Sequence, residues 1–212
     1  MEFIDFLSKA QGLPVIDTRV LSAGLMDSSV IKVQISRWEK SGKLIQLKRG
    51  IYLLAEPYRK IKSSGFYIAG VLKNPSYISL EKALEYHGLI PESVAVYTSV
   101  TTKRPTRFQT PAGIYDYRHV KPDLFWGYTS FVLNGQTAFM ATPEKALLDF
   151  FYLRPGVVSL EYLDELRLQH VENINQKKLA EYALRFQKPG LVRTTDVVQR
   201  YINNHQKQVK EL

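Results

Sequence analysis

The sequence predicts an α+β fold built in two parts, and three observations lead to this prediction. Residues 1–62 combine the spacing of short amphipathic helices with two apolar runs around a tight turn. Residues 94–140 are rich in β-branched and aromatic residues, and helical spacing returns after residue 142. Hydrophobic residues make up 45% of the 212-residue chain, which excludes wholesale disorder. We therefore expect one domain at residues 1–62 and a second at residues 63–212.

Three short helices are predicted in the first part. Apolar residues at i, i+3 and i+4 predict the first over residues 2–10. Asp17 and Thr18 provide an N-cap for a second helix. A further cap precedes the third, over residues 29–41, which Gly42 ends.

The third helix has two sides of different chemistry. Ile31, Ile35 and Trp38 share one face, which predicts that this face is buried. The opposite face and its margin carry polar and basic residues, namely Ser29, Lys32, Ser36, Arg37 and Lys40. Such a helix can pack on a core while offering a basic surface to an anionic partner.

A hairpin is predicted to follow the third helix. Residues 44–47 and 51–54 read as strands, and Lys48, Arg49 and Gly50 form the turn. Three helices and then a hairpin is the order of elements in a winged helix-turn-helix. In that fold the third helix can enter the major groove of DNA. The turn would be the wing, where glycine permits a positive φ and close approach to the DNA backbone.

The net charge of the chain supports the same interpretation. The chain has 29 basic and 20 acidic residues, a formal charge of +9. Residues 29–62 hold nine of the bases and two of the acids, which is +7 in 34 residues. Clustering of this kind favours double-stranded DNA as a partner, whereas the alternative is a small helical subdomain with a solvated basic face. The predicted DNA-binding residues are Ser29, Lys32, Ser36, Arg37, Lys40, Lys48 and Arg49.

The second part is predicted to alternate short helices and strands before it becomes helical. The strands are expected at 77–78, 94–102, 107–110, 114–120, 131–133 and 136–140, and the helices at 80–87, from 142, at 160–168, at 176–186 and at 195–203, with fraying from 204 to 212. Asn134 and Gly135 favour a type I′ turn between the last two strands. Thr142 and Pro143 are a strong helix start. The Tyr- and Phe-rich strands are expected to form the core rather than a stacking surface.

The sequence offers no catalytic constellation, so we expect neither an enzyme nor a cofactor. There is no cysteine, which excludes disulfides, thiolate chemistry and cysteine-ligated metals. The four histidines lack metal-binding spacing, so no metal site is expected. Gly65 and Gly70 have the spacing of a phosphate-binding loop, but Val71 and Leu72 stand where that loop needs Lys and Ser or Thr.

A second group of basic residues lies in the second part. It consists of Lys103, Arg104, Arg107, Arg118, His119 and Lys121. These residues form either an ordinary solvated loop or a second surface that contacts phosphates or a partner, and loop charge alone does not decide between them.

The sequence also bears on the compartment. The N-terminus has two acids within its first five residues and no basic region, so no signal peptide is expected. The apolar runs are far shorter than the roughly 20 residues of a membrane span. We expect a cytoplasmic protein without a membrane partner.

Several strings, taken in order from about residue 2 to residue 155, resemble the AbiEi family. These strings are KRGIY (48–52), SYISLEKAL (76–84), GLIP (88–91), YTSVTTKR (97–104), YRH (117–119) and ATPEKALLD (141–149). Members of that family are the antitoxins and transcriptional regulators of bacterial type IV toxin–antitoxin (abortive infection) systems.

The resemblance implies a transcriptional autorepressor. Its winged helix-turn-helix would bind inverted repeats in its own promoter, and the protein would counteract a nucleotidyltransferase toxin encoded alongside. The resemblance places the recognition helix at residues 29–40 and the wing at Lys48 and Arg49. The alternative from the residues themselves is a protein-interaction module whose 63–212 domain binds a partner protein, with DNA contact incidental.

Overall fold

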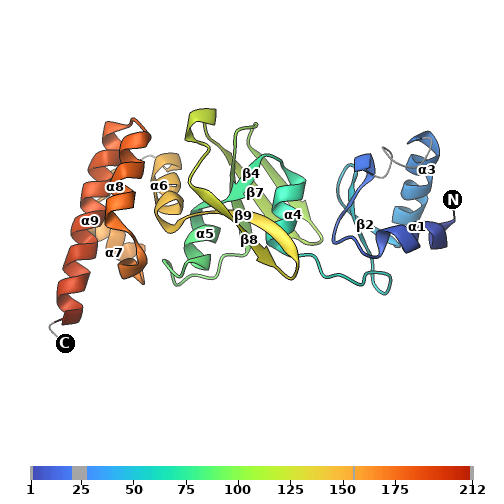
Figure 1. Ribbon diagram of the computed structural model, residues 1–212, viewed down its shortest axis with the longest axis horizontal. Helices are drawn as coiled ribbons and strands as arrows, with labels where there is room; N and C mark the ends of the chain where they lie inside the picture. The colour runs from blue at the N-terminus through green and yellow to red at the C-terminus, as the bar shows by residue number, and fades with distance from the viewer. Residues whose placement is uncertain (1, 21–27, 155, 211–212) are drawn as a thin grey trace.

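A computed structural model describes the backbone of residues 2–20, 28–154 and 156–210. The molecule is elongated, with a small N-terminal unit at one end, a β-sheet in the middle and a group of helices at the other end (Figure 1). The prediction of an α+β fold is confirmed.

The N-terminal unit, residues 2–58, is a three-stranded sheet with helices on one side. Its elements are α1 (Phe3–Ala10), β1 (Ile16–Asp17), α3 (Ser28–Lys40), β2 (Leu44–Lys48) and β3 (Ile51–Leu54). The strand order is β1-β3-β2, and β3 is antiparallel to both neighbours. Strand β1 was not predicted. Residues 18–20 are helical, and the rest of the predicted second helix lies outside the described residues.

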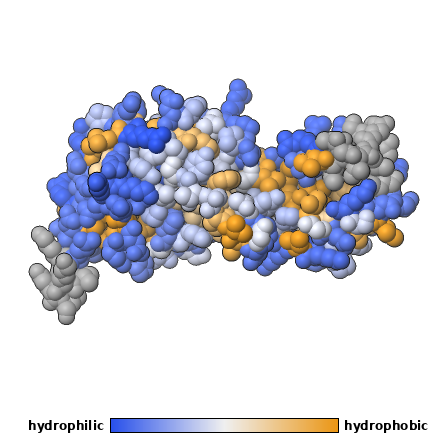
Figure 2. Space-filling model, viewed as in Figure 1, coloured by the Kyte–Doolittle hydropathy of each residue, from blue (hydrophilic) through white to orange (hydrophobic). Residues whose placement is uncertain are grey.

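Strand β3 is buried on both faces, which explains how the N-terminal unit is held in place. Tyr52 and Leu54 face a small core with Phe6, Ile31, Ile35 and Trp38, as predicted for the apolar side of α3. Ile51 and Leu53 instead belong to the large core of the rest of the chain. Alternate residues of a strand point to opposite faces, so one four-residue strand joins the two cores. On the side shown in Figure 2, hydrophobic residues gather where the N-terminal unit meets the sheet.

The second unit, residues 64–210, is centred on a six-stranded sheet. Its strands are β4 (Ser76–Ile78), β5 (Val96–Thr101), β6 (Thr106–Thr110), β7 (Gly113–His119), β8 (Tyr128–Leu133) and β9 (Gln136–Ala141). The predicted hairpins β6–β7 and β8–β9 are present, and Asn134 and Gly135 both have the positive φ of a type I′ turn. The order β6-β7-β5-β4-β9-β8 also contains the parallel pairs β5–β7 and β4–β9, so the sheet is mixed rather than purely antiparallel.

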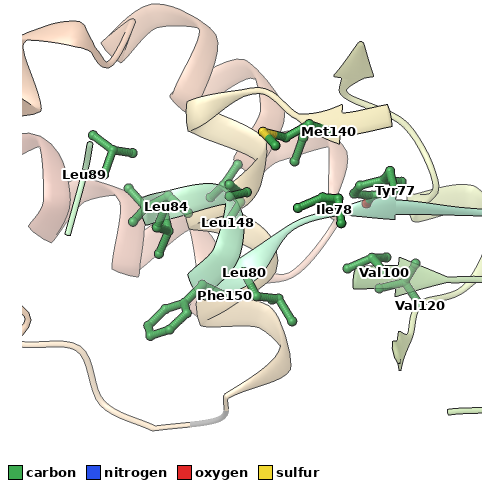
Figure 3. Close-up of a cluster of buried hydrophobic side chains, with 14 of the residues drawn as sticks. Tyr77, Ile78, Leu80, Leu84, Leu89, Val100, Val120, Met140, Leu148 and Phe150 are labelled. Atoms are coloured by element: carbon green, nitrogen blue, oxygen red, sulfur yellow. The ribbon is translucent and has the colours of Figure 1, made fainter. Parts of the chain in front are cut away.

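Helices α4 (Gly65–Leu72) and α5 (Leu80–Tyr86) lie on opposite faces of this sheet, and α6 (Pro143–Leu153) packs on α5. The helices α7 (Leu160–Glu165), α8 (Gln176–Arg185) and α9 (Pro189–Lys210) form the group at the far end (Figure 1), and short 3-10 turns lie at Pro122–Leu124 and Val171–Asn173. Tyr117 on one face donates a hydrogen bond to Ala69 O of α4 at 2.6 Å. Thr98, on the other face, donates to Ser79 O at 2.7 Å, just before α5. Figure 3 shows Leu84 of α5 and Leu148 of α6 facing each other beside the sheet.

Two helices differ from the sequence prediction. Helix α4 was not predicted; the side chain of Ser64 caps it by accepting from the backbone N of Phe66. Helix α9 continues to Lys210, so the predicted fraying from residue 204 is wrong for the described residues. Helix α6 begins with Thr142 as its cap, as predicted, and the structure adds that residues 144–151 are buried on every side.

The connection between the units is anchored by one buried side chain. Gln136 of β9 donates to Lys62 O at 3.0 Å and accepts from Ser64 N at 2.8 Å. Both ends of its amide are thus satisfied by the connecting segment, and the side chain is only 4% exposed. The short connection is therefore fixed to the beginning of β9.

Candidate nucleic-acid interface

A cleft of about 710 Å³ lies between α3 and the β2–β3 hairpin. Its charged and polar lining includes Arg19, Lys32, Ser36, Glu39, Lys48 and Arg49. The apolar face of α3 creates this arrangement, because burying Ile31, Ile35 and Trp38 turns the polar side of the helix outward.

The structure separates the predicted residues of α3 into two groups. The side chains of Lys32, Ser36, Arg37 and Lys40 are all exposed. Lys32 and Ser36 line the cleft, whereas Arg37 and Lys40 do not. The side chain of Ser29 lies outside the described residues. Within the described part of the chain, Lys32, Arg37 and Lys40 form no ion pair, so their charges are free to meet an external anion.

The turn of the hairpin has the predicted glycine geometry. Gly50 has a φ of +85°, and a Cβ at this position would lie 3.2 Å from Thr18 Oγ1. The carbonyl of Gly50 accepts from Thr18 N at 2.9 Å, which ties the turn to the helical residues 18–20. Arg49, beside it, is exposed. The backbone of the turn is therefore held in place, and the side chain of Arg49 is exposed on it.

The side chain of Lys48 does not extend from the turn of the hairpin, whereas the wing assignment predicts that it does. Its side chain is partly buried, its Nζ donates to Leu72 O at the end of α4, and it lies 5.7 Å from the centre of the Phe108 ring. Burial lowers the pKa of the Lys48 ammonium, and the nearby positive charge of Arg19 lowers it further. The cause is a shift of register between Gln46 and Lys48, which interrupts the alternation of side chains before the turn. Lys48 thus points toward the second unit rather than out from the tip of the hairpin.

Two charged residues in the cleft were not predicted. Arg19 forms an exposed ion pair with Asp17 at 2.6 Å, and its hydrogen bond lowers the pKa of the Asp17 carboxyl. Glu39 adds one negative charge to the lining. Arg19 lies before the basic segment 29–62, so counting charges along the sequence does not find it.

The second basic group is divided between two surfaces. All six residues are exposed, but alternation along β7 sends Arg118 and His119 to opposite faces of the sheet. His119 accompanies Lys103, with Nδ1 3.2 Å from Lys103 O. Arg107 and Arg118 instead line a separate cleft of about 490 Å³ with Arg154. The six residues therefore do not form one continuous surface.

A buried polar cluster in the second unit was also missed by sequence reasoning. Asp149 accepts hydrogen bonds from Tyr77 Oη and Ser79 Oγ, both at 2.9 Å, and pairs with Lys145. Ser79 precedes α5 at the N-cap position, but its hydroxyl donates to Asp149 and makes no capping hydrogen bond. Lys145 and Asp149 are completely buried, so no substrate reaches them in this structure. The cluster joins β4 to α6.

Other kinds of site find no support within the described ranges. No group of three or more His, Asp or Glu residues there is placed to hold a metal ion. None of the helices described has the length and apolar character needed to cross a membrane. No family model matches the chain, and a search among characterised proteins finds no match.

Proposed function

We propose that this protein is a sequence-specific DNA-binding transcriptional repressor, with residues 1–62 as a winged helix-turn-helix. The observation that carries the proposal is the exposed, unpaired basic side of α3 beside the cleft and the hairpin. The sheet order β1-β3-β2, with the hairpin following α3, supports it as well. In this proposal Lys32 and Ser36 contact base edges, and Arg37, Lys40 and Arg49 contact phosphates.

The resemblance to AbiEi proteins extends the proposal to a biological role. The protein would repress its own promoter at inverted repeats in the bacterial cytoplasm, as the antitoxin of a type IV toxin–antitoxin system. The 63–212 domain would counteract a nucleotidyltransferase toxin encoded alongside. No chemistry of its own is proposed, in keeping with the buried state of Lys145 and Asp149.

The test is equilibrium binding of the full chain to duplex DNA from upstream of its own gene. We expect tighter binding to this duplex than to random DNA of equal length. Arg49→Ala should weaken binding to both duplexes, because a phosphate contact carries no sequence information. Lys32→Ala should reduce the preference itself, by about 5- to 150-fold for one base contact.

The matched control is Lys177→Ala on α8, an exposed lysine remote from the cleft (Figure 1). It removes the same charge and should leave both affinities nearly unchanged. Equal wild-type affinity for upstream and random DNA would refute sequence-specific repression.

The second cleft favours an alternative function, binding of a partner protein by the second unit. Its apolar lining includes Leu84, Ile90 and Phe150. Its charged lining mixes three arginines with four carboxylates, and two of the arginines, Arg118 and Arg154, pair with carboxylates of the same lining. A concave site with an apolar floor and a charged rim suits a segment of another protein. Calorimetry with the purified co-encoded toxin would test this, with Arg118→Ala expected to weaken the complex. Absence of heat at micromolar concentrations would argue against direct binding.

A further inference from the structure

Three lysines meet where the hairpin joins the second unit. Lys48 ends β2, Lys73 follows α4, and Lys103 lies in the turn between β5 and β6. We call them the junction lysines.

Each junction lysine is held in place by one hydrogen bond. The Nζ atom of Lys48 donates to Leu72 O. The Nζ atom of Lys73 donates to Thr106 Oγ1 at 2.7 Å. Lys103 Nζ donates to Asn74 O, so the residues around the end of α4 hold two of the three ammonium groups.

The positive charges of the junction lysines are not compensated by ion pairs. In the part of the chain that the structure describes, no acidic side chain lies within ion-pair distance of any of the three, in contrast to Lys82, which pairs with Glu85 at 2.6 Å. Burial lowers the pKa of Lys73, and the charge of Lys103 lowers it further. Burial also lowers the pKa of Lys48, and the charge of Arg19 lowers it further, whereas the charge of Asp17 raises it. Mutual repulsion of this kind is relieved when an anion binds.

Hydrogen bonds within the protein use only part of the donor capacity of the junction lysines. An ammonium group has three N–H donors, and each junction lysine uses one in the bonds described above. A carbonyl or hydroxyl acceptor satisfies one donor without neutralising the charge. The remaining donors and the full charge are suited to oxygen atoms of a phosphate group.

We propose that Lys48, Lys73 and Lys103 form a phosphate-binding site for the DNA backbone, next to the cleft of α3. The inference rests on the proposed DNA-binding function and deepens it. Lys48 supports it by continuity, because its side chain lines that cleft while its Nζ bonds to the end of α4. The DNA contact then spans both units, and the second unit takes part in repression through Lys73 and Lys103.

The experiment measures the salt dependence of binding by the full chain. We compare the wild type with Lys73→Gln/Lys103→Gln, in which glutamine keeps a donor but loses the charge. Each phosphate contact changes the slope of log K against log salt by about 0.9, or about 3.5-fold in affinity between 50 and 200 mM salt. Removing both lysines should therefore reduce the affinity lost over this range by about 12-fold.

The matched control is Lys177→Gln/Lys188→Gln. These lysines are exposed near the opposite end of the molecule, and the variant makes the same change in net charge. It should retain the wild-type slope. Equal slopes for the junction variant and this control would overturn the inference.

Two further outcomes are distinguishable. If the wild type itself binds no duplex, the proposed DNA-binding function is refuted. That result is seen without the junction variant, so it is distinguishable from failure of the phosphate site. If calorimetry shows that the wild type, but not the junction variant, binds inorganic phosphate while the two bind DNA with equal slopes, the site belongs to a free anion and the inference is overturned. A slope reduced in the junction variant alone supports it.

Discussion

Replacing Lys145 by methionine tests whether the buried charge pair determines the stability of the second unit. Lys145 Nζ donates to Tyr77 Oη at 2.9 Å and pairs with Asp149 on the next turn of α6. It lies 4.9 Å and 4.8 Å from the ring centres of Trp126 and Phe186. Methionine fills much of the same volume among these rings but leaves the carboxylate of Asp149 without a cation. The variant therefore removes charge with little change in packing.

The expected loss is large because Asp149 is completely buried. Removing one partner of a buried ion pair costs about 3–5 kcal/mol, even though two hydroxyl donors remain on the carboxylate. For a chain of this size, about 2–4 °C of melting temperature corresponds to each kcal/mol, so the loss is about 6–20 °C. Denaturant unfolding followed by tryptophan fluorescence measures it. Trp126 reports on the affected unit, and Trp38 on the N-terminal unit.

The pH dependence and a double variant identify charge as the cause. Burial raises the pKa of the Asp149 carboxyl, and without Lys145 this pKa rises further because one favourable partner is lost. A group whose pKa is raised on folding favours the folded state at low pH, so the deficit of Lys145→Met should shrink as the pH falls toward 4. Lys145→Met/Asp149→Asn should recover much of the loss at neutral pH. A single-variant loss below about 1 kcal/mol, or a double variant as unstable as the single, would refute the reasoning.

Three further changes have expected outcomes. Gly50→Ala should cost about 1–2 kcal/mol, because Gly50 has a φ of +85°, and should weaken DNA binding; an unchanged midpoint of unfolding would contradict this. Glu144→Gln should make stability less dependent on pH in the acid range. Burial raises the pKa of Glu144, but hydrogen bonds from Lys178 and from backbone N–H groups outweigh burial and lower this pKa. The stability that the Glu144 carboxylate contributes is therefore present at neutral pH and is lost as the pH falls below 4.5, the ordinary pKa of a glutamate. If the stability of wild type and variant fell equally with decreasing pH, Glu144 would not have this role. Thr142→Ala should cost about 0.5–2 kcal/mol in thermal unfolding, because the Thr142 hydroxyl caps α6, whereas Thr142→Ser should cost less.

Local patterns in the sequence are sufficient for most of the elements. The sidedness of α3, the turn at Asn134 and Gly135 and the start of α6 at Thr142 each depend on residues within a few positions of one another. Helix α4 was not predicted, because prediction from the sequence depends on such local patterns. It is apolar on most sides and contains Gly70, so it lacks the periodicity that marks an amphipathic helix.

The candidate interface was only partly predictable. The exposed side of α3 follows from its apolar face. The position of Lys48 depends on a shift of register and on a carbonyl 24 residues away, which no local pattern contains. Arg118 and His119 are adjacent in sequence, yet the pleat of β7 places them on opposite faces.

The sequence by itself determined the α+β class, the basic helix face and the hairpins, because caps, periodicity and turn chemistry are local. Only the tertiary structure decided the mixed strand order, the burial of Lys145 with Asp149, and the meeting of Lys48, Lys73 and Lys103. These features depend on pairing and packing between segments distant in the chain. Their energies arise from desolvation and charge proximity, and both exist only once the chain has folded.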